Sequence, residues 1–455
     1  MKILRSGIFD IVNGLIFKVQ DFINPFLKDS FIVSKLDDII FCLISLTIVS
    51  TAFLESGMLG FLAILTSLSV VIKTLIVKGE KIELETSSLF FISFLIISFI
   101  SVINSTLVSQ SLYGFSKTLI YAAFFFAVVQ FLKSNKKKII PLVFIIFSVM
   151  TFEGIIGIIQ HNIHIESIAT WQDTSYLNPE EVLSRVYGTL KPYNPNLLAG
   201  YLVTGLGMFF ALCSLAFRNK KFSLFFLFLF CSLLTLLTLV FTGTRGAYIA
   251  LFVFLIALCF VTHNLLFEQF KIESLKKIWK LTVGSFAVLS SGIILATPSI
   301  LKRIISIFLM RGDSSTSFRF NVYQSSFRMF TDNWVLGIGT GNQTFREIYG
   351  LYMYSGFHAL SSYCIYLEIA LESGIFALIA YLGFFVCLFK NGIYNFLRKG
   401  DFTSKVLVSS CLLSISAVLV HGFVDTVYFR APIQLVFWII VAILTVLVRE
   451  EVSEQ

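Results

Sequence analysis

Charged residues are scarce in this sequence, and their scarcity excludes two classes of protein. Asp, Glu, Lys and Arg make up 13% of the 455 residues, where about 25% is usual in soluble globular domains. Apolar residues make up 57%, and Phe alone fills 51 positions. A soluble globular fold is therefore excluded, and so is disorder, which needs low hydrophobicity and high net charge. The composition predicts a protein that crosses a membrane many times.

Cysteine is present but lacks the spacing of a metal site or a disulfide framework. The seven cysteines are far apart, lie mostly inside apolar runs and form no CxxC pair. Such cysteines are typical of small buried side chains. We therefore expect no metal and no cofactor.

Long apolar runs predict an all-α fold with about 12 transmembrane helices, because one crossing needs roughly 20 apolar residues. Together these runs form a transmembrane domain over residues 39–448. Residues 1–38 mix charged and apolar residues and are expected to form an amphipathic segment on the membrane surface. Residues 449–455 are expected to be a cytoplasmic tail. The predicted spans lie near residues 39–54, 57–77, 87–108, 117–132, 139–160, 197–217, 222–242, 246–266, 281–301, 360–389, 406–422 and 433–448.

Basic residues between the apolar runs set the predicted orientation. The formal net charge is +9, and most of the excess falls in short clusters in the even-to-odd connections. Basic residues favour the cytoplasmic side, so both termini are predicted to be cytoplasmic, in the cytoplasmic (inner) membrane. Since orientation explains these clusters, nucleic acid is not expected as a partner. The clusters lie at residues 78–81, 133–138, 218–221, 271–280 and 390–405.

Two long loops are then predicted to be extracytoplasmic, residues 161–196 and residues 302–359. The second, between helices 9 and 10, is the larger and is expected to contain short amphipathic helices. It carries several Arg residues, Arg319 among them. Either a long loop is translocated regardless of its charge, or these residues form an anion-binding surface.

Arg245 is the strongest local candidate for function. It lies in Thr244-Arg245-Gly246, between two apolar runs with almost no connector. An Arg near membrane depth is costly, so it usually faces a cavity and pairs with an anion. Gly246 would let backbone N–H groups approach that anion. The structural alternative is an Arg that extends to the lipid headgroups from a tight hairpin.

Asn194 and Asn196 open another predicted span, in the segment Asn194-Pro195-Asn196. Either Asn can cap the new helix, and Pro195 fixes the direction of its first turn. A helix N-terminus also attracts anions, so a binding role is the alternative.

Gly337, Gly339 and Gly341 have part of the spacing of a dinucleotide-binding fingerprint. That motif counts only in a strand–turn–helix unit, and no strand precedes it here, so a nucleotide site is rejected. A glycine-rich turn packed against the membrane face is the preferred interpretation.

The last predicted spans carry ionisable residues. Glu368 and Glu372 are four residues apart, so they share a helical face that should point into the bundle. Such carboxylates are functional candidates, unless pairing to an Arg satisfies them. Asp425 is expected to pair with Arg430 at the membrane interface. His421 is either a satisfied helix-end histidine or a proton carrier.

Taken in order, these segments resemble the O-antigen ligase and polymerase superfamily of bacterial membrane proteins, in particular its cyanobacterial branch of bicarbonate (inorganic carbon) transporters. The resemblance covers residues 40–448 and depends on the ordered combination of segments rather than on any single one. The segments are Arg185-Val186-Tyr187, Asn194 to Leu202, Thr244-Arg245-Gly246, Phe318 to Tyr323, Gly337 to Asn342, Ala359 to Tyr363, Leu367 to Gly374 and His421 to Val427.

The ligase side of this superfamily implies two Arg that grip the diphosphate of a polyprenyl-linked glycan, and a His that activates the sugar acceptor. Arg245 and Arg319 match the two Arg. The His position falls on Tyr363, and His358 lies five residues earlier. Because a Tyr with a pKa near about 10 is a poor base at neutral pH, Tyr363 and His358 are both kept as catalytic candidates.

The sequence thus predicts a multi-pass membrane protein that binds an anion on its extracytoplasmic side. The transporter branch implies bicarbonate as that anion and a role in inorganic-carbon uptake. The alternative is an enzyme, a metal-independent glycosyltransferase that acts on polyprenyl-diphosphate-linked glycan. A third interpretation, an accessory or scaffold subunit, predicts that neither Arg matters. Membrane lipid is an expected partner in each case. The predicted anion-binding residues are Arg245, Arg319, Asn194, Asn196, Gly246 and Asp425.

Overall fold

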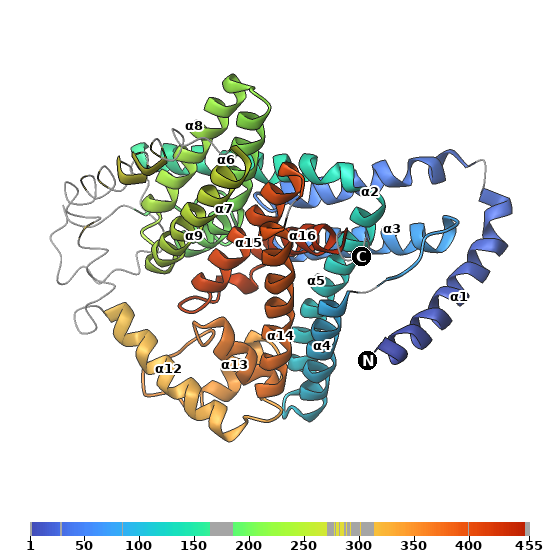
Figure 1. Ribbon diagram of the computed structural model, residues 1–455. Helices are drawn as coiled ribbons and strands as arrows, with labels where there is room; N and C mark the ends of the chain where they lie inside the picture. The colour runs from blue at the N-terminus through green and yellow to red at the C-terminus, as the bar shows by residue number, and fades with distance from the viewer. Residues whose placement is uncertain are drawn as a thin grey trace.

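The computed structural model describes most of the chain, and every regular element in the described part is a helix (Figure 1). The described residues are 2–27, 30–83, 85–163, 185–270, 314–398 and 400–450, with some further positions between 277 and 301. The helices are α1 (Lys2–Leu27), α2 (Phe31–Ser50), α3 (Ser56–Ile76), α4 (Thr86–Asn104), α5 (Val108–Ser134), η1 (Lys136–Lys138), α6 (Ile139–Ile163), α7 (Pro195–Arg218), α8 (Phe222–Phe241), α9 (Arg245–Phe270), α12 (Ser314–Asp332), α13 (Asn342–Tyr349), α14 (Ile365–Leu397), α15 (Phe402–His421), η4 (Val427–Phe429) and α16 (Ala431–Glu450).

Ten of the described helices are long and apolar enough to cross a membrane. They are α3 to α9 and α14 to α16, with η1 counted as the start of α6. The predicted all-α, multi-pass membrane fold is therefore confirmed. The predicted span near residues 281–301 lies mostly outside the described residues, so the total number of spans stays a prediction.

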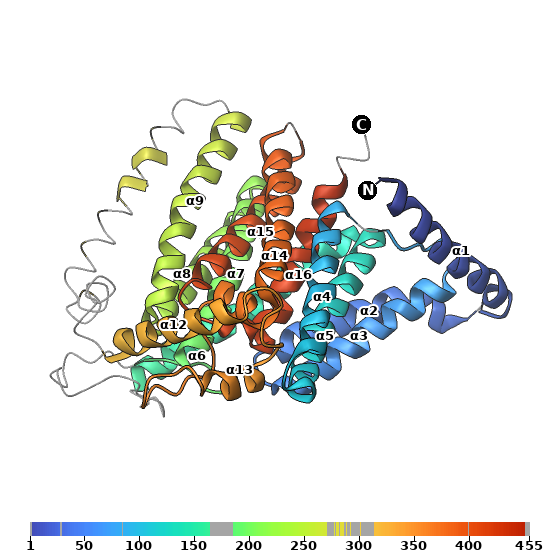
Figure 2. The same cartoon turned by 90° about the horizontal axis from the view of Figure 1, so that it is seen from below.

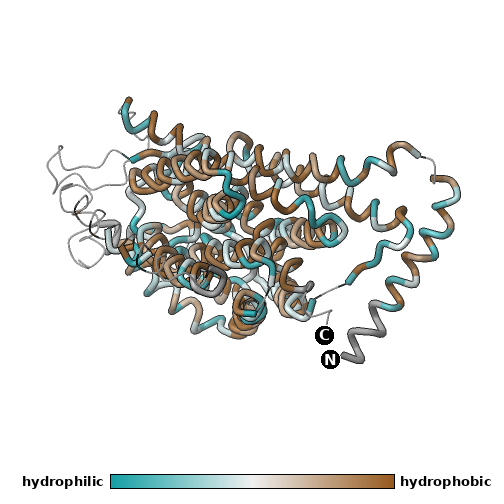
Figure 3. Tube along the Cα trace, turned by 45° about the horizontal axis from the view of Figure 1, so that its top comes forward, coloured by the Kyte–Doolittle hydropathy of each residue, from teal (hydrophilic) through white to brown (hydrophobic). Residues whose placement is uncertain are grey.

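The helices differ in how much of their surface other helices cover. The whole apolar window of α16 is buried, whereas only 22% of the window of α8 is buried. Phe226 and Phe230 on α8 are 64% and 59% exposed. Removing apolar surface from water is favourable. We infer that α16 forms the centre of the bundle and that α8 presents its phenylalanine side chains to lipid. Figure 3 shows hydrophobic residues along most of the packed helices, with hydrophilic residues gathered mainly near their ends.

An aromatic cluster around Trp438 of α16 forms the middle of the bundle. The ring centroids of Phe91, Phe125 and Phe437 lie 4.7, 5.2 and 5.5 Å from that of Trp438. Phe384 of α14 is 6.2 Å away. Each such ring pair adds about 0.5–1.5 kcal/mol beyond the burial of its area. The cluster therefore ties α4 and α5 to α14 and α16, which come from the other end of the chain.

The helix α2 begins at Phe31, earlier than the predicted start near residue 39. Ion pairs compensate the acidic residues in this added stretch. Asp37 pairs with Lys73 at 2.7 Å, and Asp38 pairs with Lys138 at 3.1 Å. Because their partners lie on other elements, these pairs are not visible in a local sequence pattern.

The predicted loop over residues 302–359 contains two helices, α12 and α13, as expected; its residues 302–313 lie outside the described part. Figure 2 shows both helices at one end of the packed bundle, away from the connection between α14 and α15. The basic cluster at 390–405 spans that connection and the adjoining ends of α14 and α15. The positive-inside rule predicts that α12 and α13 are extracytoplasmic.

The glycine-rich segment 337–341 is a turn packed against membrane-crossing helices. Gly337, Gly339 and Gly341 have positive φ values of 73°, 100° and 104°, which glycine adopts without strain. The Gly339 amide donates to Glu372 O at 3.0 Å, and the Gly341 amide donates to Glu372 Oε1 at 2.8 Å. The Thr340 amide donates to Ser111 Oγ at 2.8 Å. The predicted structural role is confirmed, and the turn is fastened to α5 and α14.

The close approach of this turn to α5 gives a testable prediction about stability. A side-chain carbon at Gly114 of α5 would lie 2.6 Å from Gly341 Cα, too close for a non-bonded contact. We expect Gly114→Ala to lower the free energy of unfolding by about 1–3 kcal/mol, measured by thermal unfolding of the purified protein in detergent. Gly60→Ala on α3, where nothing lies within 4 Å, is the control, and equal melting temperatures for the two variants would contradict this packing.

Candidate functional site

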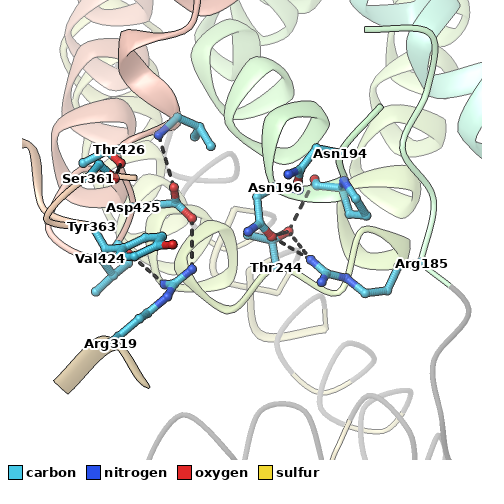
Figure 4. Close-up of polar contacts among 12 residues, drawn as sticks. Arg185, Asn194, Asn196, Thr244, Arg319, Ser361, Tyr363, Val424, Asp425 and Thr426 are labelled. Atoms are coloured by element: carbon cyan, nitrogen blue, oxygen red, sulfur yellow. Dashed lines mark hydrogen bonds and ion pairs between the residues drawn. The ribbon is translucent and has the colours of Figure 1, made fainter. Parts of the chain in front are cut away.

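Arg319 of α12 reaches the connection between α15 and α16 (Figure 4). Its Nη1 donates to Val424 O at 2.6 Å, and its Nη2 pairs with Asp425 Oδ2 at 3.2 Å. The Asp425 side chain is 6% exposed and that of Arg319 is 25% exposed. A charge pair this shielded from water is held in one geometry, because separating it would leave a buried charge without compensation.

Asp425 therefore pairs with Arg319 and not with Arg430, so the predicted Asp425–Arg430 pair was wrong. The second carboxylate oxygen, Oδ1, accepts a hydrogen bond from the Val427 amide at 3.1 Å and so holds the start of η4. Arg430 follows η4 and is exposed. Closeness in sequence favoured Arg430, but the η4 turn separates the two side chains and the fold brings α12 to Asp425 instead.

Tyr363 lies beside Arg319 in an unusual backbone conformation. The guanidinium carbon is 5.2 Å from the ring centroid, and Tyr323 Oη donates to Tyr363 O at 3.2 Å. Tyr363 has φ +56°, a left-handed conformation that is uncommon for a bulky residue and is often found at functional sites. Burial raises the pKa of Tyr363 above its usual value, although Arg319 opposes the shift. Burial likewise raises the pKa of Tyr323 to about 12.

Glu368 holds the segment that precedes Tyr363. Its Oε2 accepts a hydrogen bond from the Ser362 amide at 2.6 Å, and the hydroxyls of Ser361 and Thr426 are 2.6 Å apart. Glu368 and Glu372, which the sequence marked as functional candidates, thus both accept backbone N–H groups, from the segments before and after α13. Among the described residues, both carboxylates accept hydrogen bonds from backbone amides. The pairing with an Arg that the sequence suggested is not seen among them.

A second polar group surrounds Arg185, to the right of the Arg319 group in Figure 4. Arg185 Nε donates to Thr242 O at 2.7 Å, and its Nη2 donates to Asn196 Oδ1 at 2.7 Å. The Thr244 hydroxyl also donates to Asn196 Oδ1, at 3.1 Å. Asn194 Oδ1 accepts from the Asn196 amide at 2.8 Å. The predicted cap of α7 is confirmed in Asn194, whereas Asn196 holds Arg185 in place.

Arg185 is a buried residue that site prediction missed. The sequence placed it only in a segment of the resemblance, Arg185-Val186-Tyr187, and assigned it no role. The one local signal was an Arg shortly before the Asn-Pro-Asn helix start. Its link to Thr242 and Thr244 depends on the fold, since these residues lie more than fifty positions along the chain.

Gly246, two residues after Thr244, packs against the 421–425 segment. A side-chain carbon at Gly246 would lie 2.7 Å from Val424 Cγ2 and 2.9 Å from His421 Cδ2. Only glycine therefore allows the start of α9 to approach the 421–425 segment this closely. Val424 O in turn accepts the hydrogen bond from Arg319. The 421–425 segment thus contacts both Arg319 and the start of α9, where Arg245 is the first residue.

His421 and His358 occupy opposite environments. His421 is 4% exposed, and its Nε2 is buried and makes no hydrogen bond to the described residues. His358 is exposed on the connection between α13 and α14. Its neighbour Phe357 packs against Phe318 of α12, with ring centroids 5.8 Å apart. Of the predicted catalytic residues, Tyr363 therefore contacts Arg319 directly, and His358 lies on the loop leading to it.

A comparison with known protein families bears on this arrangement. Residues 230–382 match the family model described as O-antigen ligase. This part of the chain is similar to O-antigen ligases. The match covers about one third of the chain and contains Arg245, Arg319, His358 and Tyr363. A search of curated proteins found no match.

The match supports the predicted likeness to the O-antigen ligase superfamily. It does not extend to bicarbonate or inorganic-carbon transport, which stays a prediction from the sequence. The chain is a multi-pass membrane protein in contact with lipid, and its likeness is to a family of inner-membrane proteins.

The pairing of Asp425 with Arg319, and not with Arg430, gives a testable prediction. We expect Asp425→Ala to lower the free energy of unfolding by about 1–3 kcal/mol, because it leaves the Arg319 and Val427 donors unsatisfied. Arg430→Ala should leave it nearly unchanged, since Arg430 is exposed. Chemical denaturation in detergent measures both, and an equal loss in the two variants would contradict the assignment of Arg319 as the partner.

Proposed function

We propose that this chain is a membrane glycosyltransferase of the O-antigen ligase and polymerase type. It transfers glycan from a polyprenyl-diphosphate-linked donor to an acceptor at the extracytoplasmic end of the bundle. One observation carries the proposal: the part that matches the O-antigen ligase family contains Arg245 and Arg319, and the 421–425 segment packs against Gly246, next to Arg245, and binds Arg319.

The chemistry of these residues suits a diphosphate leaving group. A guanidinium donates paired hydrogen bonds to phosphate oxygens and keeps its charge at all relevant pH values. Arg245 is the first residue of α9, where the helix dipole also favours an anion. Fixed positive groups aimed at the departing diphosphate stabilise the charge that develops as its bond to the sugar breaks.

The acceptor hydroxyl loses a proton as its oxygen forms the new bond to the sugar carbon. Tyr363 cannot take that proton at neutral pH, because burial raises its pKa and keeps the phenol protonated. We assign proton acceptance to His358, since the unprotonated nitrogen of a neutral imidazole accepts a proton and this side chain lies on the connection that leads to Tyr363. Tyr363 then acts through its ring, against the Arg319 guanidinium.

Loss of either Arg should slow transfer strongly. We expect Arg245→Ala and Arg319→Ala to lower kcat by at least about 100-fold, since each removes a group that stabilises the leaving diphosphate. Arg319→Lys should recover only a small part, because an ammonium cannot bind two oxygens in a fork. The assay follows transfer of lipid-linked glycan, extracted from the source membranes, to envelope acceptors by the protein in nanodiscs.

Arg346→Ala is the control in this assay, since Arg346 is an exposed residue on α13. It should retain the wild-type rate. Full activity of the Arg245 and Arg319 variants would overturn the proposal, and so would the absence of transfer by correctly folded wild-type protein.

The proton assignment is tested separately. We expect His358→Gln to lower kcat by about 100-fold, the usual effect of losing a general base. Tyr363→Phe should keep the ring contact with Arg319 and stay within about threefold of wild type. Because the pKa of Tyr363 is raised, its phenol stays protonated from pH 6 to 9, about the working range of such an assay, and the Tyr363→Phe profile should follow that of wild type. A large loss in Tyr363→Phe with an active His358→Gln would reverse the assignment.

A further inference from the structure

A groove of about 510 Å³ lies along α12, next to the Arg319 site. Aromatic side chains form most of its wall, and two of them are largely exposed: Phe320 by 61% and Phe327 by 59%. The buried face of α12 is a different one and carries Val322 and Met329. The described lining residues are Phe320, Tyr323, Gln324, Phe327 and Arg328 of α12 with Tyr354 of the connection between α13 and α14.

Polar groups lie at the edge of this groove. The Arg328 guanidinium lies 4.5 Å from the ring centroid of Tyr354. Tyr354 Oη donates to Gln324 Oε1 at 3.4 Å, which orients the Gln324 amide nitrogen as a donor. The groove therefore combines flat aromatic faces with amide and guanidinium donors.

This combination matches the chemistry of a carbohydrate. A sugar ring has an apolar C–H face, which packs on aromatic rings, and a rim of hydroxyls, which accept hydrogen bonds from fixed donors. A lipid chain offers nothing for Gln324 and Arg328 to bind. In addition, α12 is not among the helices apolar enough to cross the membrane.

The groove is continuous with the Arg319 site through one side chain. Tyr323 lines the groove, and its hydroxyl donates to Tyr363 O at 3.2 Å. Arg319 itself points away from this side, to Val424 and Asp425. A sugar chain bound in the groove would thus reach the site at Tyr363. It would approach from a different side than an anion bound by Arg319.

We propose that this groove is the binding site for the sugar chain of the acceptor. The proposal rests on the proposed function, because it names the second substrate of the same transfer reaction. It assigns Phe320, Phe327 and Tyr354 to stacking on sugar rings, and Gln324 and Arg328 to the sugar hydroxyls.

Direct binding tests the groove without relying on catalysis. The probes are oligosaccharides released by mild acid from the envelope of the source cells, added to the full chain in nanodiscs and followed by saturation-transfer NMR. We expect wild type to bind at least one of them and Phe327→Ala to bind it about tenfold more weakly. Phe327→Tyr keeps the ring and should bind like wild type. Phe252→Ala on α9 removes a ring that is 65% exposed elsewhere and should change nothing.

Three results would overturn the groove as an acceptor site. They are no binding of any envelope oligosaccharide by folded wild type, equal binding by Phe327→Ala, and displacement of the bound sugar by polyprenyl phosphate, which would indicate an apolar occupant.

Transfer kinetics separate this proposal from the proposed function. Phe327→Ala should raise KM for the acceptor about tenfold and leave KM for the lipid-linked donor unchanged. If wild type binds the oligosaccharide in the groove but never cleaves the donor, the transferase proposal fails and the sugar site stands. If transfer proceeds and Phe327→Ala keeps the wild-type KM for the acceptor, the groove proposal fails and the transferase stands.

Discussion

Arg319 of α12 binds the connection between α15 and α16, through the Val424 carbonyl and the Asp425 carboxylate. This contact joins α12 to the last two membrane-crossing helices. One guanidinium makes two bonds there, to Val424 O and to Asp425. Because removing either partner would leave a shielded charge uncompensated, this contact holds α12 in place together with the apolar packing of Val322 and Met329. The position of α12 in turn places Tyr323 against Tyr363 and orients the groove beside it. The site therefore depends on one charge pair between parts of the chain that are far apart in sequence.

A second constraint is that backbone groups must be satisfied where the chain enters and leaves the membrane. Here, intramembrane carboxylates meet that need. Glu372 accepts the Gly341 amide and Glu368 accepts the Ser362 amide. Both glutamates lie on α14 and bind the segments before and after α13. They explain why two acidic residues persist in an otherwise apolar helix, and they make α14 the support on which the turns before and after α13 rest.

The fold was largely predictable because the membrane imposes a one-dimensional pattern of long apolar runs. The turn at Gly337 to Gly341 and the Asn194 cap were predictable for a different reason, since both depend on local backbone geometry. Long-range pairs were not. Asp425 favoured nearby Arg430 in sequence, and nothing in the chain indicated Arg319, 106 residues away. Arg185 and the roles of Glu368 and Glu372 were likewise set by partners on distant elements.

Only part of the groove could likewise be predicted from the sequence. Phe320, Tyr323 and Phe327 recur at helical spacing, so one aromatic face of α12 could be read from the sequence. Tyr354, which meets Gln324 and Arg328 across the groove, comes from a separate connection. Without it, the face is indistinguishable from an ordinary amphipathic helix that packs on the bundle.

The most direct test of the account is the binding of polyprenyl diphosphate, the leaving group of the proposed reaction, to the protein in nanodiscs. Microscale thermophoresis should show binding at least about tenfold tighter than that of polyprenyl monophosphate, no displacement by bicarbonate, and a loss of that preference in Arg319→Ala. Equal affinity for the two lipids in wild type, or displacement of the diphosphate by bicarbonate, would contradict a diphosphate site at Arg319 and return bicarbonate to the first place among the candidate ligands.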